Sequence, residues 1–74
     1  MYYVYLLRDI RTKKTYIGYT ENLERRLYEH RNKNPELIYY EAYKNKLDAQ
    51  TRESKLKQRG QAVRWLKERL KNSL

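Results

Sequence analysis

The sequence predicts an α/β domain of the α+β type, in which a three-stranded, mainly antiparallel sheet carries flanking helices in the order ββαβαα. Short segments rich in β-branched and aromatic residues alternate with segments whose apolar residues recur at helical spacing. A chain of 74 residues has room for one domain, 1–74, and it contains no repeat or linker-like segment. These observations predict one small layered domain.

Three segments predict strands, at residues 2–7, 15–19 and 36–43, because aromatic and β-branched residues dominate each of them. The polar residues 8–14 predict a hairpin loop, although it contains neither glycine nor proline. Gly18 lies inside the second strand. A glycine there indicates close approach of another backbone or of a ligand.

Three segments predict helices, at residues 23–32, 47–59 and 61–72. Thr20 or Asn22 is a suitable cap for the first helix, and the second is expected to end at Gly60 in a left-handed conformation. The apolar stripe of the last helix consists of Val63, Leu66, Leu70 and Leu74.

The chain is strongly basic, and the excess is concentrated in its second half. The formal net charge is +9, from 18 Lys and Arg against 9 Asp and Glu. Residues 1–43 include eight basic and six acidic side chains, whereas residues 44–74 include ten and three. Such a field attracts a polyanion, most commonly nucleic acid, although solubility alone also explains a basic surface. The basic helices lack a broad aromatic face, so no membrane partner is expected.

The absence of cysteine excludes disulfides and thiolate metal sites. The N-terminal segment has no basic region ahead of its apolar run, which is shorter than a signal or membrane-spanning segment. We therefore expect a cytoplasmic protein. Its expected partner is nucleic acid, and no small-molecule cofactor is expected.

Charged residues interrupt one apolar stripe of the first helix. Helical spacing places Leu23, Arg26, Leu27 and His30 together. A buried guanidinium needs an anion, and no acid lies on this stripe, so a phosphate is a candidate partner. Alternatively, Arg26 extends to solvent and His30 satisfies a backbone group.

In the second helix, Glu53 is the charged residue that interrupts the apolar stripe, where it lies between Ala49 and Leu56. It has two interpretations. One is an ion pair with Arg26. The other is a ligand for a divalent cation, since Mg²⁺ is commonly held by one carboxylate together with waters and substrate oxygens.

The aromatic composition is also unusual, because the chain has nine tyrosines and no phenylalanine. Strand alternation places Tyr3 and Tyr5 on one face of the first strand, and Tyr16 and Gly18 on one face of the second. If these strands form a hairpin, Tyr5 and Tyr16 lie near each other beside the glycine. Each is otherwise explained as a core tyrosine whose hydroxyl needs a partner.

The same residues resemble the motifs of the GIY-YIG nuclease family. Tyr16-Ile17-Gly18 matches the second signature triplet, and Tyr3-Val4-Tyr5 occupies the first, with tyrosine in place of its glycine. Arg26, His30 and Glu53 follow at the spacing and in the context of the family's arginine, histidine and glutamate.

The resemblance covers essentially the whole chain and is greatest to small members that consist of the catalytic domain alone. The asparagine that many members carry near the final helix is matched only by Asn72, close to the C-terminus.

The family's chemistry assigns a role to each matched residue. Tyr5 is implied to be the general base, and Tyr16 to orient the water or the phosphate. Arg26 binds non-bridging oxygens, His30 hydrogen-bonds the tyrosine or a phosphate oxygen, and Glu53 holds a single Mg²⁺ or Mn²⁺. The arginine and the metal are expected to lower the pKa of the tyrosine.

The resemblance therefore implies a metal-dependent DNA endonuclease that selects DNA structure rather than sequence. The residues expected to contact the DNA backbone are Lys55, Lys57, Arg59, Arg64 and Lys67. Two alternatives remain open: a DNA-binding module of the same fold with little turnover, or a small RNA-binding protein whose tyrosines stack on bases.

Overall fold

A three-stranded sheet forms the centre of the molecule. The computed structural model describes residues 1–58 and 60–73, with all of their side chains except those of residues 33 and 60–63. The strands of the described residues are β1 (Tyr2–Asp9), β2 (Thr15–Thr20) and β3 (Pro35–Tyr43). They pair antiparallel in the order β2-β1-β3, so β1 is central and its neighbours are edge strands.

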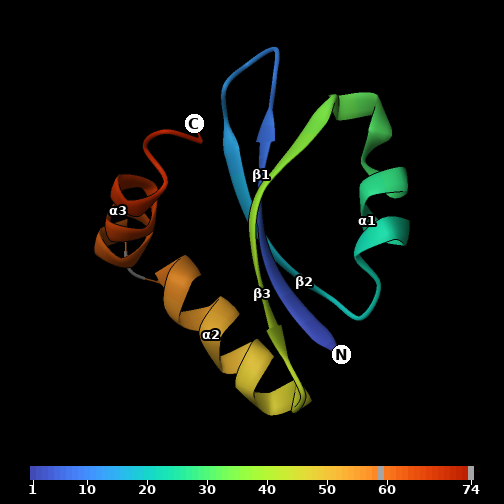
Figure 1. Cartoon of the computed structure of the whole chain (residues 1–74), viewed down its shortest axis with the longest axis vertical. Helices are drawn as coiled ribbons and strands as arrows, with labels where there is room; N and C mark the ends of the chain where they lie inside the picture. Colours follow the sequence, from blue (N-terminus) through green and yellow to red (C-terminus); the bar gives the residue numbers. More distant parts are fainter. Residues whose placement is uncertain (59, 74) are drawn as a thin grey trace.

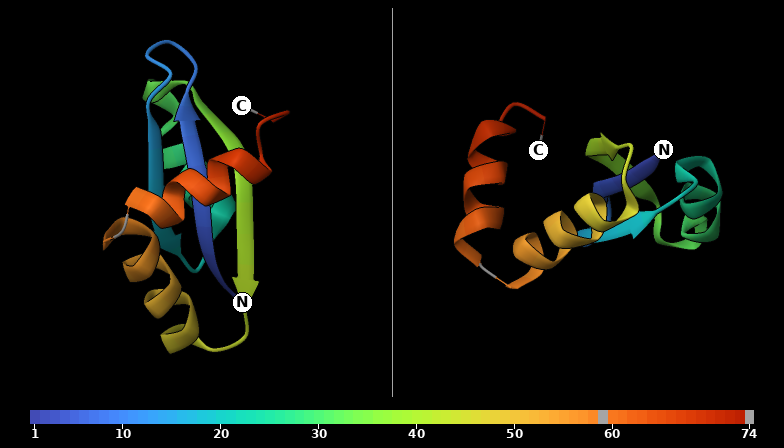
Figure 2. Two further views of the ribbon diagram at one scale, coloured as in Figure 1. Left: turned by 90° about the vertical axis from the view of Figure 1, so that its left-hand side faces the viewer. Right: turned by 90° about the horizontal axis from the view of Figure 1, so that it is seen from below.

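Helices lie on both sides of this sheet. Helix α1 (Leu23–Glu29), which the 3₁₀ turn η1 (Arg31–Lys33) follows, is on one side, and α2 (Lys46–Gln58) and α3 (Gly60–Arg69) are on the other (Figure 1). Viewed from their own side, α3 crosses the strands (Figure 2). The order ββαβαα confirms the predicted fold class. Within the described residues, every helix is too short or too polar to cross a bilayer.

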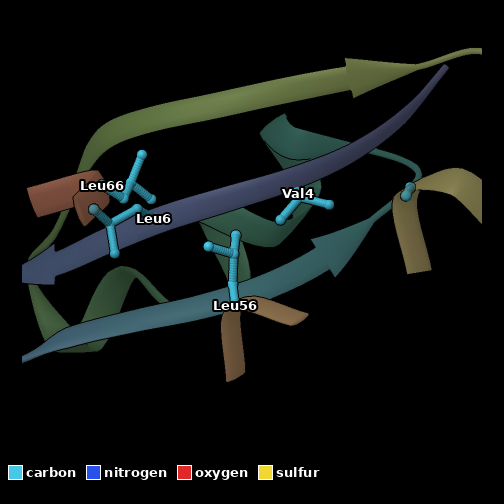
Figure 3. Packing of buried hydrophobic residues seen from close by; sticks show 5 residues of the cluster. Val4, Leu6, Leu56 and Leu66 are labelled. Carbon is cyan, nitrogen blue, oxygen red and sulfur yellow. The ribbon is translucent and has the colours of Figure 1, made fainter. Parts of the chain in front are cut away.

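The hydrophobic core lies between the sheet and the pair α2 and α3. Val4 and Leu6 project from one face of β1 and pack with Ala49, Leu56 and Leu66 (Figure 3). All five residues are at most 3% exposed. Each larger side chain buried in this way contributes about 1.5–3 kcal/mol. Side chains alternate along a strand, so Tyr3 and Tyr5 project from the other face of β1, on the side of α1.

The loop between β1 and β2 turns without glycine or proline. The carboxylate of Asp9 accepts hydrogen bonds from the backbone N–H groups of Arg11 (2.8 Å) and Thr12 (3.3 Å). Lys13 takes the left-handed conformation that a tight turn requires, with φ 65°. A side-chain acceptor and one left-handed residue therefore replace the usual turn glycine.

Helix α1 begins where the sequence predicts and ends earlier. The side-chain oxygen of Asn22 caps it by accepting a hydrogen bond from the N–H of Arg25 at 3.0 Å. The helix ends at Glu29 instead of near residue 32, because η1 and the left-handed Asn34 (φ 48°) redirect the chain into β3.

The boundary between α2 and α3 also differs from the prediction. Helix α2 ends at Gln58, Arg59 lies outside the described residues, and Gly60 is already the first residue of α3. Leu66 and Leu70 of the predicted stripe pack on the core, whereas Val63 and Leu74 are outside the described side chains. Helix α3 ends at Arg69, so Asn72 lies in the turn that follows it.

Candidate active site

Tyr5 is held against the backbone of β2. It pairs with Gly18 across the β1–β2 ladder and is 6% exposed. A Cβ atom at position 18 would lie 2.8 Å from Cε1 of Tyr5 and nearer still to its hydroxyl oxygen. Side chains do not pack at such distances, so the ring of Tyr5 occupies space that only a glycine leaves free.

A pocket of about 190 Å³ opens beside Tyr5. It brings together three predicted site residues from different elements: Tyr5 of β1, Tyr16 of β2 and His30 at the end of α1. The remaining wall consists of Leu7, Arg8, Asp9, Ile17 and Pro35. Tyr16 is 42% exposed, so a ligand here meets one accessible and one shielded phenol.

Arg26 lies on the less exposed face of α1, together with Leu23, Leu27 and His30, although no residue of this helix is fully buried. Its Nη1 atom is 3.6 Å from Oε1 of Glu29, in a part-exposed pair that contributes little. The Nε atom of Arg26 is buried and has no hydrogen-bond partner among the described residues. The guanidinium therefore retains donor capacity for an anion.

Glu53 lies on α2 between the buried Ala49 and Leu56, and its side chain is 23% exposed. Its carboxylate is 3.3 Å from Nζ of Lys57, one turn later, which is itself 56% exposed. Among the described residues, the alternative ion pair between Arg26 and Glu53 is not formed, since each pairs along its own helix. The weak pair with Lys57 leaves the carboxylate available to a cation.

The charges of Arg26 and Glu53 both influence the hydroxyl of Tyr5. Burial has the largest influence and raises the pKa of Tyr5 above its usual value of 10.0, while Arg26 lowers it and Glu53 and Glu29 raise it. Arg26 thus has the lowering effect expected of it, but burial outweighs it and the net direction is upward. Around Tyr5 the described structure thus brings Tyr16 and His30 into one pocket and Arg26 and Glu53 into electrostatic range, without an ion pair between Arg26 and Glu53.

The sequence matches the family model of the GIY-YIG catalytic domain over residues 1–69. The chain belongs to the GIY-YIG family. A UPF0213 protein of Clostridium perfringens is 37% identical to it, in an alignment that covers 77% of this chain and 71% of the relative. No solved structure matches the chain significantly. GIY-YIG domains are generally nucleases, which implies a nucleic acid substrate.

GIY-YIG nucleases generally use a divalent metal. Within the part of the chain that the structure describes, no three His, Asp or Glu side chains cluster as a preformed metal site. Glu53 still fits a hard cation, because Mg²⁺ takes one or two carboxylates and completes its shell with waters and substrate oxygens. Its partly shielded carboxylate, 3.3 Å from the exposed ammonium group of Lys57, is the group that would hold the ion.

The basic residues predicted to contact nucleic acid belong to α2 and α3 of the GIY-YIG domain. Lys55, Lys57 and Arg64 are exposed and Lys67 is partly exposed, whereas Arg59 lies outside the described residues. Helix α2 packs on β1 and on β2, the edge strand that contains Gly18.

One polar cluster of this GIY-YIG domain was not predicted from the sequence. The carboxylate of Glu41 accepts hydrogen bonds from the hydroxyls of Tyr39 (2.7 Å) and Tyr43 and from Nε of Arg52 (3.0 Å). Burial opposes ionisation of Glu41, but the hydrogen bonds from Arg52, Tyr43 and Tyr39 hold its pKa below the usual value. The cluster joins β3 to the turn of α2 that carries Glu53. The sequence of β3 did contain a signal for this cluster: Tyr39, Glu41 and Tyr43 occupy every second position and therefore share one face of the strand.

Proposed function

We propose that this GIY-YIG domain is a divalent-metal-dependent endonuclease that hydrolyses DNA phosphodiester bonds and selects DNA structure rather than sequence. One observation carries the proposal: Tyr5 shares a pocket with Tyr16 and His30, and the charges of Arg26 and Glu53 act on its hydroxyl. A proton acceptor, an anion-binding group and a carboxylate for a cation are what hydrolysis of a phosphodiester requires.

Arg26 binds the non-bridging oxygens of the scissile phosphate. A guanidinium presents its N–H groups in a fork that matches two phosphate oxygens. Its Nε has no hydrogen-bond partner among the described residues, and its pair with Glu29 is part-exposed and 3.6 Å long. Both support this role, because little has to be broken when the phosphate arrives.

Tyr5 acts as the general base and takes a proton from the attacking water onto its phenolate oxygen. Burial keeps the hydroxyl protonated in the free protein, and Arg26 is the neighbour that favours the phenolate. Tyr16, which lines the same pocket, orients the water or the phosphate. His30 hydrogen-bonds the tyrosine or a phosphate oxygen and is the alternative proton acceptor in the same pocket.

Glu53 holds a single Mg²⁺ or Mn²⁺. When bound, the ion polarises the scissile phosphate and stabilises the leaving oxygen. The carboxylate of Glu53 also raises the pKa of Tyr5, so neutralising its charge favours ionisation of the base.

The basic side chains of α2 and α3 hold the DNA backbone. Lys55, Lys57, Arg64 and Lys67 offer phosphate contacts, which position a substrate without reading its sequence. Selection then depends on the shape of the DNA at the pocket.

A cleavage assay tests this function. Purified protein is incubated with continuous, nicked, flapped, branched and single-stranded DNA, in Mn²⁺ or in EDTA. The expected result is Mn²⁺-dependent internal cutting that differs between these structures and not between sequences. Salt-sensitive DNA binding without any cutting would overturn the proposal in favour of a binding module. Binding that prefers single-stranded RNA, again without cutting, would indicate an RNA-binding protein.

A further inference from the structure

Two tyrosine rings form a contact beside the proposed active site. Tyr3 stands where the GIY-YIG signature has a glycine, and its ring meets that of Tyr40 edge-on, with centroids 6.0 Å apart and planes at 65°. This geometry is typical of favourable aromatic pairs. Because a glycine has no ring, this contact depends on the tyrosine that this chain carries at position 3.

Strand register places the pair next to Tyr5. Tyr40 lies directly opposite Tyr5 in the β1–β3 ladder, and Tyr3 precedes Tyr5 by two positions. Directly opposed residues share a face of a sheet, as do residues two apart on one strand. Tyr3 and Tyr40, here called the tyrosine platform, therefore lie on the face of Tyr5, opposite to the face that buries Val4 and Leu6.

Tyr40 remains accessible to a ligand. It is 52% exposed and belongs to the edge strand β3. Its neighbours Tyr39 and Tyr43 point to the opposite face and donate hydrogen bonds to Glu41, whereas the contact that the described structure gives Tyr40 is the ring of Tyr3. The ring of Tyr40 is thus supported by the ring of Tyr3 and about half exposed to solvent.

We infer that the tyrosine platform stacks an unpaired nucleobase of DNA beside Tyr5, an inference that rests on the proposed function. Aromatic side chains stack on any base, because every base has a π face. In a duplex the bases are already paired and stacked, so only an unpaired base reaches Tyr40. The net charge of +9 attracts the backbone, and the platform adds a preference for unpaired DNA without reading its sequence.

Binding measured in EDTA separates this inference from catalysis. The probes are a short fluorescein-labelled oligothymidylate and a duplex of the same length, each titrated with the full chain and followed by anisotropy. Removing the ring in Tyr40→Leu is expected to weaken binding of the single strand by about 5- to 150-fold, the range for loss of one stacked base. Duplex binding is expected to change by less than about 2-fold, because no phosphate contact is removed.

Two variants make this experiment specific. Tyr40→Phe keeps the ring and is expected to bind the single strand like the parent protein. Tyr28→Leu is a matched control, since Tyr28 is 64% exposed but has the Arg31 guanidinium over its ring at 4.0 Å. Unchanged single-strand binding by Tyr40→Leu would overturn the inference, as would equal weakening toward both probes. If the protein shows the expected binding but cuts no DNA, the inference about the tyrosine platform stands and the proposed nuclease function is wrong. The binding test and the cleavage assay can therefore fail independently.

Discussion

Tyr5 lies across Gly18, with its ring in the volume that a side chain at position 18 would fill. The two residues are directly paired in the β1–β2 ladder, so strand register brings them together. The second signature triplet of the GIY-YIG family therefore has a packing explanation in this chain. Its glycine leaves room for the tyrosine of the first triplet.

Substituting Gly18→Ala should displace the phenol of Tyr5. A methyl group there overlaps the ring, and overpacking of this kind costs about 1–3 kcal/mol of stability. Moving a catalytic group by about 1 Å lowers the rate by about 100-fold. Thermal denaturation and cleavage assays should show a modest loss of stability and a large loss of activity. An active Gly18→Ala protein would mean that Tyr5 is not the base.

Tyr5→Phe removes one hydroxyl and should leave the fold intact. Loss of a general base lowers the rate by about 10²- to 10⁴-fold. The sign of the pH dependence follows from the raised pKa of Tyr5. Burial keeps most of the phenol protonated near neutral pH, and the phenolate fraction grows as the pH rises, so wild-type cleavage should rise with pH throughout the neutral and mildly alkaline range. In Tyr5→Phe this rise should be absent. An identical pH–rate profile in both proteins would exclude the phenolate and favour His30.

Glu53→Gln should reduce cleavage to the level seen in EDTA, because the amide no longer offers a negative charge to a cation. Asp48→Asn is the matched control, since it makes the same chemical change at an exposed position in the first turn of the same helix. Circular dichroism should show both proteins folded, and Mn²⁺ titration should show weakened binding only for Glu53→Gln. Equal Mn²⁺ affinity in the two variants would contradict the metal role of Glu53.

The cluster around Glu41 should control stability against pH. Hydrogen bonds lower the pKa of Glu41, so its contribution is complete above the unfolded value of 4.5 and is lost as the pH falls through the lower folded value. Burial and the bond to Glu41 raise the pKa of Tyr43 to about 12, so its contribution is present below 10.0 and is lost as the pH rises toward 12. Urea denaturation at several pH values measures the free energy of unfolding, and so both the loss of stability in acid and the loss in alkali.

Arg52→Leu should cost about 1–3 kcal/mol at neutral pH, because the carboxylate of Glu41 loses its charged partner. The acid-induced loss of stability should also become smaller, since the pKa of Glu41 moves back toward its usual value. The double change Glu41→Gln with Arg52→Leu is expected to be less harmful than Arg52→Leu alone. A more damaging double variant would show that the two side chains stabilise the fold independently.

The elements and the inward faces of the helices could be predicted from the sequence. Period-two and helical patterns are imposed by local backbone geometry, so they identified the strands, the Arg26 and His30 stripe and the position of Glu53 between Ala49 and Leu56. Element ends were less predictable. The left-handed Asn34 and the turn η1 shorten α1, and the local pattern of residues 23–32 does not contain that information.

Local spacing therefore determined which residues share a face, and only the tertiary structure decided which faces meet. Register across β1 places Tyr5 on Gly18 and Tyr40 beside Tyr5, and the docking of α2 gives Glu41 its partner Arg52. The same docking leaves Arg26 and Glu53 paired along their own helices instead of with each other. The physical reason is that periodicity depends on the backbone of one segment, whereas register and helix docking depend on how all of the segments pack around Val4, Leu6 and Leu56.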